Sequence, residues 1–332
     1  MTFTDLSAVQ RLRFFTTIEF PVIGKRLEGI FWLHGTKKSR EVDLPIGQDT
    51  VLLVSQLLRK SHQHPLELET ALPWNMGVDR EMLPKRLDQL WLYGTTFFEA
   101  LSTDERLETA WLETARDISL LIQLKRTVPS LFVGYLNKFS NSLPSSVHDY
   151  LLVHALEEIT QTLIFRRFTQ IANLPYFQRL PAYTQTSALF PEMHPCVGLL
   201  GTLLIGWMVD SGAMYATQAS GVDPLTREIF KQHHSVKIRH IEFSRRIIED
   251  YLGNASIRER HKFREIFRHV IPEILTSLRF DPEIAQHTSF PFPVSGNHAA
   301  SIEAVRTSVH SQLLDEERFK SMMNWLWKME LI

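Results

Sequence analysis

The chain has 332 residues, of which 44% are hydrophobic and 22% charged, so it is long enough to bury at least one sizeable core. Its 36 Lys and Arg nearly balance its 37 Asp and Glu, which argues against partners such as nucleic acid or an anionic membrane surface. A single cysteine, Cys196, excludes disulfides within the chain and cysteine-rich metal sites, and it suits a reducing compartment. No secretory signal is visible at the N-terminus, so we expect a cytoplasmic protein.

Helical periodicity dominates the chain, and strand patterns are nearly absent. We predict helices over residues 5–30, 49–62, 102–127, 147–171, 196–219, 224–252 and 256–278, and a last helix from about 299 that breaks near Asp315. Ser102 and Glu105 form a capping box at the start of the third helix, and Pro129 is expected to end it. The proline-rich stretches 64–85 and 175–195 are predicted to be connections between helices.

The longest apolar run extends from Cys196 to Val209, and it is shorter than the ~20 residues that span a bilayer. Its glycines favour a core helix packed closely against a neighbour. Because no segment has the composition of a linker between domains, we predict one all-α domain. We divide it into a wrapping N-terminal arm (1–85), a core bundle (86–255) and C-terminal helices (256–332).

The helix predicted over 224–252 carries ionisable side chains on its apolar face. His233, Lys237 and His240 are spaced i, i+4, i+7, which places them within roughly 60° of one another around a helix. Burying an unpaired charge is costly, so a partner for Lys237 is expected inside. The alternative is that Lys237 extends to the surface and that the histidines are ordinary core residues.

Glu158 lies on the apolar face of another predicted helix and needs a buried partner for the same reason. Pairing Glu158 with Lys237 would satisfy both groups. Glu158 with His233 and His240 would also provide two imidazoles and one carboxylate, which is the ligand set of a mononuclear iron site. His154, one turn before Glu158, is either a further ligand or a core histidine.

Three segments occur in an order that resembles a known family. They are Leu-Tyr-Gly-Thr-Thr-Phe-Phe-Glu-Ala-Leu-Ser at 92–102, Glu-Glu-Ile-Thr-Gln-Thr-Leu-Ile-Phe at 157–165, and the stretch from His233 to Arg245. They are similar to segments of the para-aminobenzoate N-oxygenase family of diiron oxygenases. The resemblance covers roughly residues 70–255 and implies a ferritin-like helical bundle with additional N- and C-terminal helices.

The same resemblance implies seven metal ligands, three histidines and four glutamates. The matching positions that keep a ligand are Glu158, His233 and His240. The changed positions are Gln161, in place of a histidine, and Lys237, Gln123 and Gly206, in place of glutamates, the last two mapped less securely. Because an ammonium group cannot replace a bridging carboxylate, we expect that the normal diiron site is lost.

Two hypotheses about the function remain. In the first, the protein is an oxidoreductase that uses one iron or manganese on Glu158, His233 and His240 to oxidise an amine-type small molecule, free or carrier-bound. Further ligands would come from His154, Gln161 or Gln123, and the missing glutamate at Gly206 would leave an open coordination position. At most one metal ion would be bound per chain.

In the second hypothesis no metal is bound. Lys237 then pairs with Glu158, neutral histidines fill the core, and the protein is a pseudoenzyme or a partner subunit. We prefer this hypothesis because Lys237 would repel a metal ion beside it. The family resemblance implies a homodimer, and a heteromer with an intact relative is the alternative. A nucleophilic role for the Lys237 amine is a third interpretation.

Overall fold

The fold is described from a computed structural model, which covers residues 44–139, 143–178, 194–294 and 298–332. Its α-helices are α3 (Gln48–Gln63), α4 (Thr96–Glu99), α5 (Thr103–Phe139), α6 (Ser145–Ile171), α8 (Pro195–Thr217), α9 (Pro224–Asn254), α10 (Ile257–Leu278), α11 (Ala299–Arg306) and α12 (Val309–Lys328). Short 3-10 helices span Trp74–Met76, Leu87–Gln89 and Pro282–Gln286. Within the described ranges the β pairing consists of one isolated bridge between Leu83 and Val222. The predicted all-α class is confirmed.

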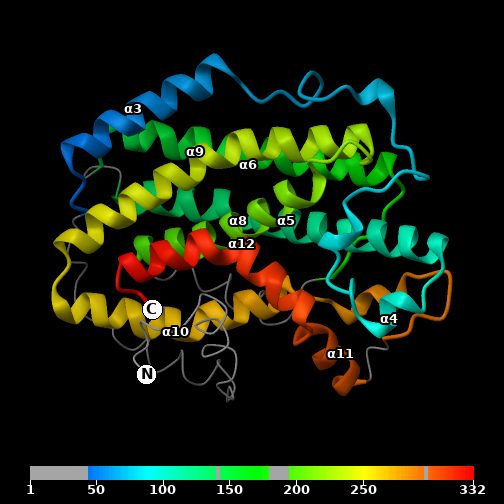
Figure 1. Cartoon of the computed structure of the whole chain (residues 1–332). Coiled ribbons are helices and arrows are strands. Elements are labelled where there is room, and N and C mark those ends of the chain that lie inside the picture. Colours follow the sequence, from blue (N-terminus) through cyan, green and yellow to red (C-terminus); the bar gives the residue numbers. More distant parts are fainter. Residues whose placement is uncertain (1–43, 140–142, 179–193, 295–297) are drawn as a thin grey trace.

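Two helical hairpins form the core of the bundle. Helix α5 packs along α6, and α8 packs along α9, with α5 also against α8 and α6 against α9. Helix α3 covers α6 and α9 on one side, while α10 and α12 lie against α8 on the other (Figure 1). This is the predicted ferritin-like bundle with additional helices.

Helix α5 is longer than predicted. Pro129 was expected to end it near residue 127, but the helix continues to Phe139. A proline removes one backbone N–H and costs stability inside a helix. However, Leu131, Phe132 and Tyr135 beyond it are all buried in the core, and their packing holds the additional turns in place.

The predicted capping box is present at the start of α5. The Ser102 amide donates to Glu105 Oε2 at 2.7 Å, and the Glu105 amide donates to Ser102 Oγ at 3.4 Å. The break predicted near Asp315 is wrong, because the chain breaks between α11 and α12, where Ser308 caps α12. Asp315 is buried within α12 and pairs with Arg279 at 2.5 Å. The helix predicted over 5–30 lies outside the described residues.

Helix α8 is long and apolar enough to cross a membrane, but 78% of its most apolar window is buried inside the bundle. It is therefore a core helix, as predicted. Gly198 permits its close approach to α5, because a Cβ at this position would overlap the Tyr135 hydroxyl. In the middle of the helix, Gly206 faces Lys237 of α9.

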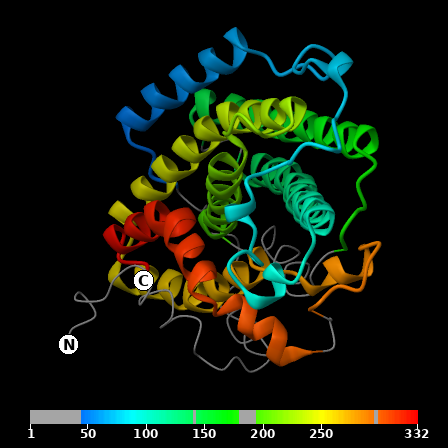
Figure 2. The same cartoon turned by 45° about the vertical axis from the view of Figure 1, so that its right-hand side comes forward.

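The described part of the N-terminal arm crosses one end of the core helices before it reaches α4 (Figure 2). The Asp79 amide donates to Asp223 Oδ1 at 2.9 Å, and the Arg86 amide donates to the Ala216 carbonyl at 2.9 Å. These contacts fix the arm to the start of α9, and the residue that follows the arm to the end of α8. The division of the chain into arm, core and C-terminal helices stays a prediction.

Candidate functional site

A cluster of buried polar side chains lies between α5, α6 and α9. We call it the central cluster, and its members are Lys125 from α5, His154, Glu157, Glu158 and Gln161 from α6, and His233, Lys237 and His240 from α9. Each has an exposed fraction of 5% or less. A cluster of this kind must neutralise its charges internally, because solvent does not reach them.

Glu158 is the centre of these contacts. Its Oε2 accepts a hydrogen bond from Lys125 Nζ at 2.8 Å. Its Oε1 lies 3.4 Å from Lys237 Nζ, 3.0 Å from His240 Nδ1 and 3.5 Å from His154 Nε2. Both carboxylate oxygens therefore have an ammonium partner, one from each neighbouring helix.

The charge states of this centre follow from burial and from the neighbouring charges. Burial alone would raise the pKa of Glu158, but the ammonium groups of Lys125 and Lys237 outweigh it and hold that pKa well below its usual value. Burial lowers the pKa of Lys125 to about 8, opposed by the charge of Glu158. At neutral pH the centre is thus a carboxylate held between two ammonium ions.

His240 lies between two carboxylates. Its Nε2 is 2.6 Å from Glu157 Oε2, and its Nδ1 is the atom that faces Glu158. Each ring nitrogen of His240 therefore faces a carboxylate oxygen of α6. Arg239 completes the arrangement by donating to Glu157 Oε1 at 2.6 Å. Burial would raise the pKa of Glu157, but its bonds with His240 and Arg239 lower it to about 2.

His233 contacts the cluster through Gln161 and not through Glu158. Its Nδ1 lies 3.2 Å from Gln161 Oε1, which also accepts from Lys125. Its Nε2 is 3.8 Å from Asp210 of α8, and Asp210 in turn binds His234 at 2.8 Å. Burial, reinforced by the neighbouring ammonium charges, keeps the pKa of His233 well below its ordinary value. His233 is therefore neutral.

The sequence-predicted site residues are thus mostly brought together. Those within the cluster are Glu158, Lys237, His240, His154, Gln161 and His233. Gln123 is the exception, because it donates to the Phe177 carbonyl at 3.0 Å. Sequence reasoning gave no role to Lys125, Glu157 or Asp210. All three are buried: Lys125 and Glu157 bind other residues of the cluster, and Asp210 lies beside His233.

Gly206 makes room for the end of the Lys237 side chain. A Cβ at position 206 would overlap both Cε and Nζ of Lys237. The resemblance places a glutamate here, and the first hypothesis expected an open coordination position in its absence. Lys237 fills this space.

Comparison with known proteins agrees with this geometry. Residues 48–325, most of the chain, match the family model described as p-aminobenzoate N-oxygenase AurF. The chain belongs to the p-aminobenzoate N-oxygenase family. A search of curated proteins found no match.

The AurF family is a diiron family, but the residues of the central cluster do not fit two irons. Lys125 and Lys237 place two positive charges on the carboxylate that metal ions would need, and Lys237 also fills the space beside Gly206. Among the described residues, the group that could hold a single metal ion is His154, Glu158 and His240, whose ligand atoms lie within 4.8 Å of one another. This group contains His154 where the sequence predicted His233.

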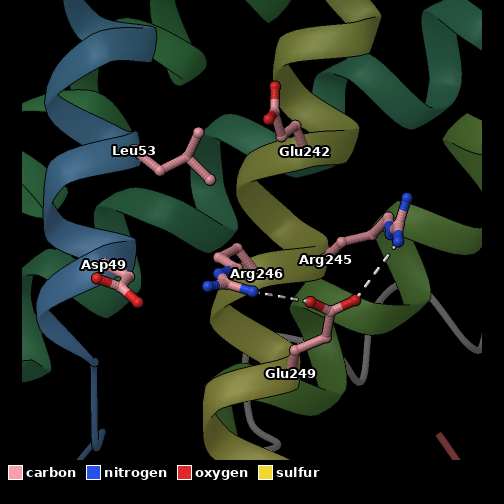
Figure 3. A pocket seen from close by; sticks show the side chains of 6 residues that line it. All are labelled: Asp49, Leu53, Glu242, Arg245, Arg246 and Glu249. Atoms are coloured by element: carbon pink, nitrogen blue, oxygen red, sulfur yellow. Dashed lines mark hydrogen bonds and ion pairs between the residues drawn. The ribbon is translucent and has the colours of Figure 1, made fainter.

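A surface groove of about 350 Å³ lies between α3 and α9 (Figure 3). It is lined by Asp49, Leu53, Glu242, Arg245, Arg246 and Glu249. Its two arginines lie 3.5 and 3.6 Å from Glu249, so much of its charge is neutralised locally. None of its lining residues belongs to the central cluster.

The fit between Gly206 and Lys237 generates the first prediction. Gly206→Ala should lower the free energy of unfolding by about 1–3 kcal/mol, because the new methyl group overlaps the end of the Lys237 side chain, whose ammonium group is held by Glu158. In a Lys237→Ala background the same change should be neutral or stabilise by up to about 1 kcal/mol, since alanine is the better helix former. Urea denaturation of the four proteins measures both values.

Gly134 of α5 provides the matched control, because a Cβ there would meet nothing within 4 Å. Gly134→Ala should have the same effect in both backgrounds. An equal loss of stability from Gly206→Ala with and without Lys237 would contradict the assignment of this space to the lysine.

A second prediction concerns pH. Burial, followed by the charge of His240, lowers the pKa of His154 from 6.5 to about 3. Below pH 6.5 the unfolded chain therefore binds a proton that folded His154 does not, and stability falls as the pH falls. His154→Gln should make this slope shallower by about 1.4 kcal/mol per pH unit between roughly pH 6 and 4.

Urea unfolding at pH 7, 6, 5 and 4 checks this prediction. The exposed His64 serves as the control, because His64→Gln should leave the slope as in the wild type. A His154→Gln variant with the wild-type slope would show that this imidazole is protonated in the folded protein.

Proposed function

We propose that this protein is an N-oxygenase-family member whose central site is a metal-free ion cluster, and that it acts as a pseudoenzyme or as a partner subunit. The observation that carries this proposal is the position of the two lysines. Lys125 and Lys237 each approach a different oxygen of Glu158, at 2.8 and 3.4 Å. Glu158 is the glutamate that the family resemblance retains as a ligand.

Charge balance supports the same conclusion. A dimetal site needs several carboxylates to neutralise two divalent cations, and by resemblance the family supplies four. This cluster has Glu157 and Glu158, and its cations are Lys125 and Lys237, with Arg239 at the edge. Adding a divalent ion would increase an existing excess of positive charge in a poorly solvated core.

A second candidate function rests on one specific observation. His154, Glu158 and His240 bring two imidazoles and a carboxylate together, and buried His154 is neutral, as a ligand must be. A single iron or manganese held there would support oxidation of an amine-type substrate. Lys237 contacts the same Glu158 oxygen, so the metal would first have to displace an ammonium group.

The third prediction separates these two functions by metal content. Purified protein is incubated anaerobically with Fe(II) or Mn(II), passed through a desalting column and analysed by mass spectrometry for bound metal. The metal-free site predicts less than roughly one metal ion per ten chains, because the ammonium groups repel it. About one metal ion per chain would establish the second function instead.

Matched variants test whether the lysines are the cause. Lys125→Gln with Lys237→Glu removes both ammonium groups and adds a carboxylate, so the variant should bind at least about one metal ion per chain. The control is Lys85→Gln, because Lys85 is also buried and pairs with Asp117 at 2.8 Å outside the cluster. Metal binding by the control, or none by a folded double variant, would contradict the proposal.

A further inference from the structure

Residues 65–78 join α3 to the segment that leads to α4, and we call them the strap. Leu72 is the one residue of the strap that is buried. Among the described residues, a single hydrogen bond connects the strap to the bundle, from Arg167 Nη1 of α6 to Glu69 Oε2 at 2.7 Å. Glu69 keeps 74% of its side chain exposed, so this contact adds little stability. The other hydrogen bonds of the strap, such as that from Trp74 Nε1 to the Leu68 carbonyl, are internal.

The chain is anchored on both sides of the strap. Before it, buried Ser61 in the last turn of α3 accepts a hydrogen bond from Arg239 Nε of α9 at 3.1 Å. After it, buried Lys85 pairs with Asp117 of α5 at 2.8 Å. Near the second anchor, Gly77 has a φ of +67°, which L side chains rarely adopt. The strap is thus a weakly attached segment between two fixed points, with a glycine bend at one end.

The strap covers an apolar cluster at which α5, α6 and α9 meet. Leu72 belongs to this cluster together with buried side chains of the three helices, among them Phe165 of α6. Phe165 also contacts the central cluster. Its ring centre lies 5.5 Å from that of His233 and 6.0 Å from Lys125 Nζ. The apolar cluster beneath the strap therefore extends to the side of the central cluster that holds these two residues.

We propose that the strap opens by itself while the helical bundle stays folded, and that each opening uncovers the apolar route to Lys125 and His233. Opening exposes one buried side chain and breaks one surface ion pair, whereas unfolding of the bundle exposes the whole core. Segments with few buried apolar contacts open at a smaller free-energy cost than the core does. The strap would control the access of small molecules to the central cluster, whether or not that cluster binds a metal ion.

The fourth prediction uses the reactivity of two thiols in one molecule. Ile229→Cys places a thiol in the apolar cluster, on the helix α9 against which the strap residues Trp74–Met76 lie. Native Cys196 is buried in the main core and reports on the bundle. With an excess of an aromatic disulfide reagent, followed by absorbance, the introduced thiol should react at least about 10-fold faster than Cys196. Ile164→Cys on α6 gives a second probe in the same cluster.

The dependence on urea separates the two opening events. The rate of the introduced thiol should stay nearly constant at low urea, because opening of the strap exposes little surface. The rate of Cys196 should rise with urea, because its exposure requires unfolding of the bundle. Circular dichroism should show unchanged helix content in the probe variants.

Matched substitutions in the core and in the strap complete the test. Leu200→Ala in the main core lowers the stability of the bundle but not that of the strap. It should accelerate the reaction of Cys196 about 10-fold or more and leave that of the introduced thiol within about two-fold. Leu72→Ala should accelerate the introduced thiol about 10-fold or more. Equal rates for the two thiols, the same urea dependence, or equal acceleration of both by Leu200→Ala would overturn the proposal, because opening would then require unfolding of the bundle.

Discussion

The interior of this protein depends on how one buried carboxylate is neutralised. Glu158 is fully buried, and its oxygens receive Lys125 from α5 and Lys237 and His240 from α9. Replacing such a group by apolar side chains is often neutral or stabilising, but removing one partner leaves a buried charge and typically costs about 3–5 kcal/mol. The centre therefore constrains the relative positions of α5, α6 and α9 more than it adds net stability. The charged residues of the three helices must lie at the same level along the bundle axis. A shift of one helix by one turn would leave charges unpaired.

Most of the fold could be predicted from the sequence, because apolar periodicity and capping residues are local signals. The two errors arose where tertiary contacts overrode a local signal. Pro129 normally ends a helix, yet buried residues on the following turns keep α5 helical to Phe139. Asp315 marked an expected break, but Arg279 from the end of α10 neutralises it inside α12. A sequence does not show which distant cation will meet a buried aspartate.

The candidate site was partly predictable for the same reason. Glu158 and Lys237 stand out as charges on apolar stripes, and pairing them follows from the cost of burying either alone. Lys125 gives no such signal, because Arg126 follows it and Pro129, where the helix was expected to end, is only four residues away. Gly206 was misinterpreted for another reason. The absence of a side chain indicated an open position, whereas a long side chain from the neighbouring helix occupies it.

The substitutions in the central cluster are physically linked to one another. A glutamate at position 206 and a lysine at 237 would compete for the same space, so the lysine requires the glycine. In the metal-free site that we propose, ammonium ions neutralise Glu158 and fewer carboxylates are needed than in a dimetal site, which fits Gln123 and Gly206 at two positions where the resemblance places glutamates. His240 also contacts Glu157, and a carboxylate on the far nitrogen is the usual way to orient a metal-binding histidine. His154 Nδ1 and Gln161 Nε2 have no hydrogen-bond partner among the described residues. The cluster thus combines the side-chain orientations of a metal site with the charges of an ion-paired core.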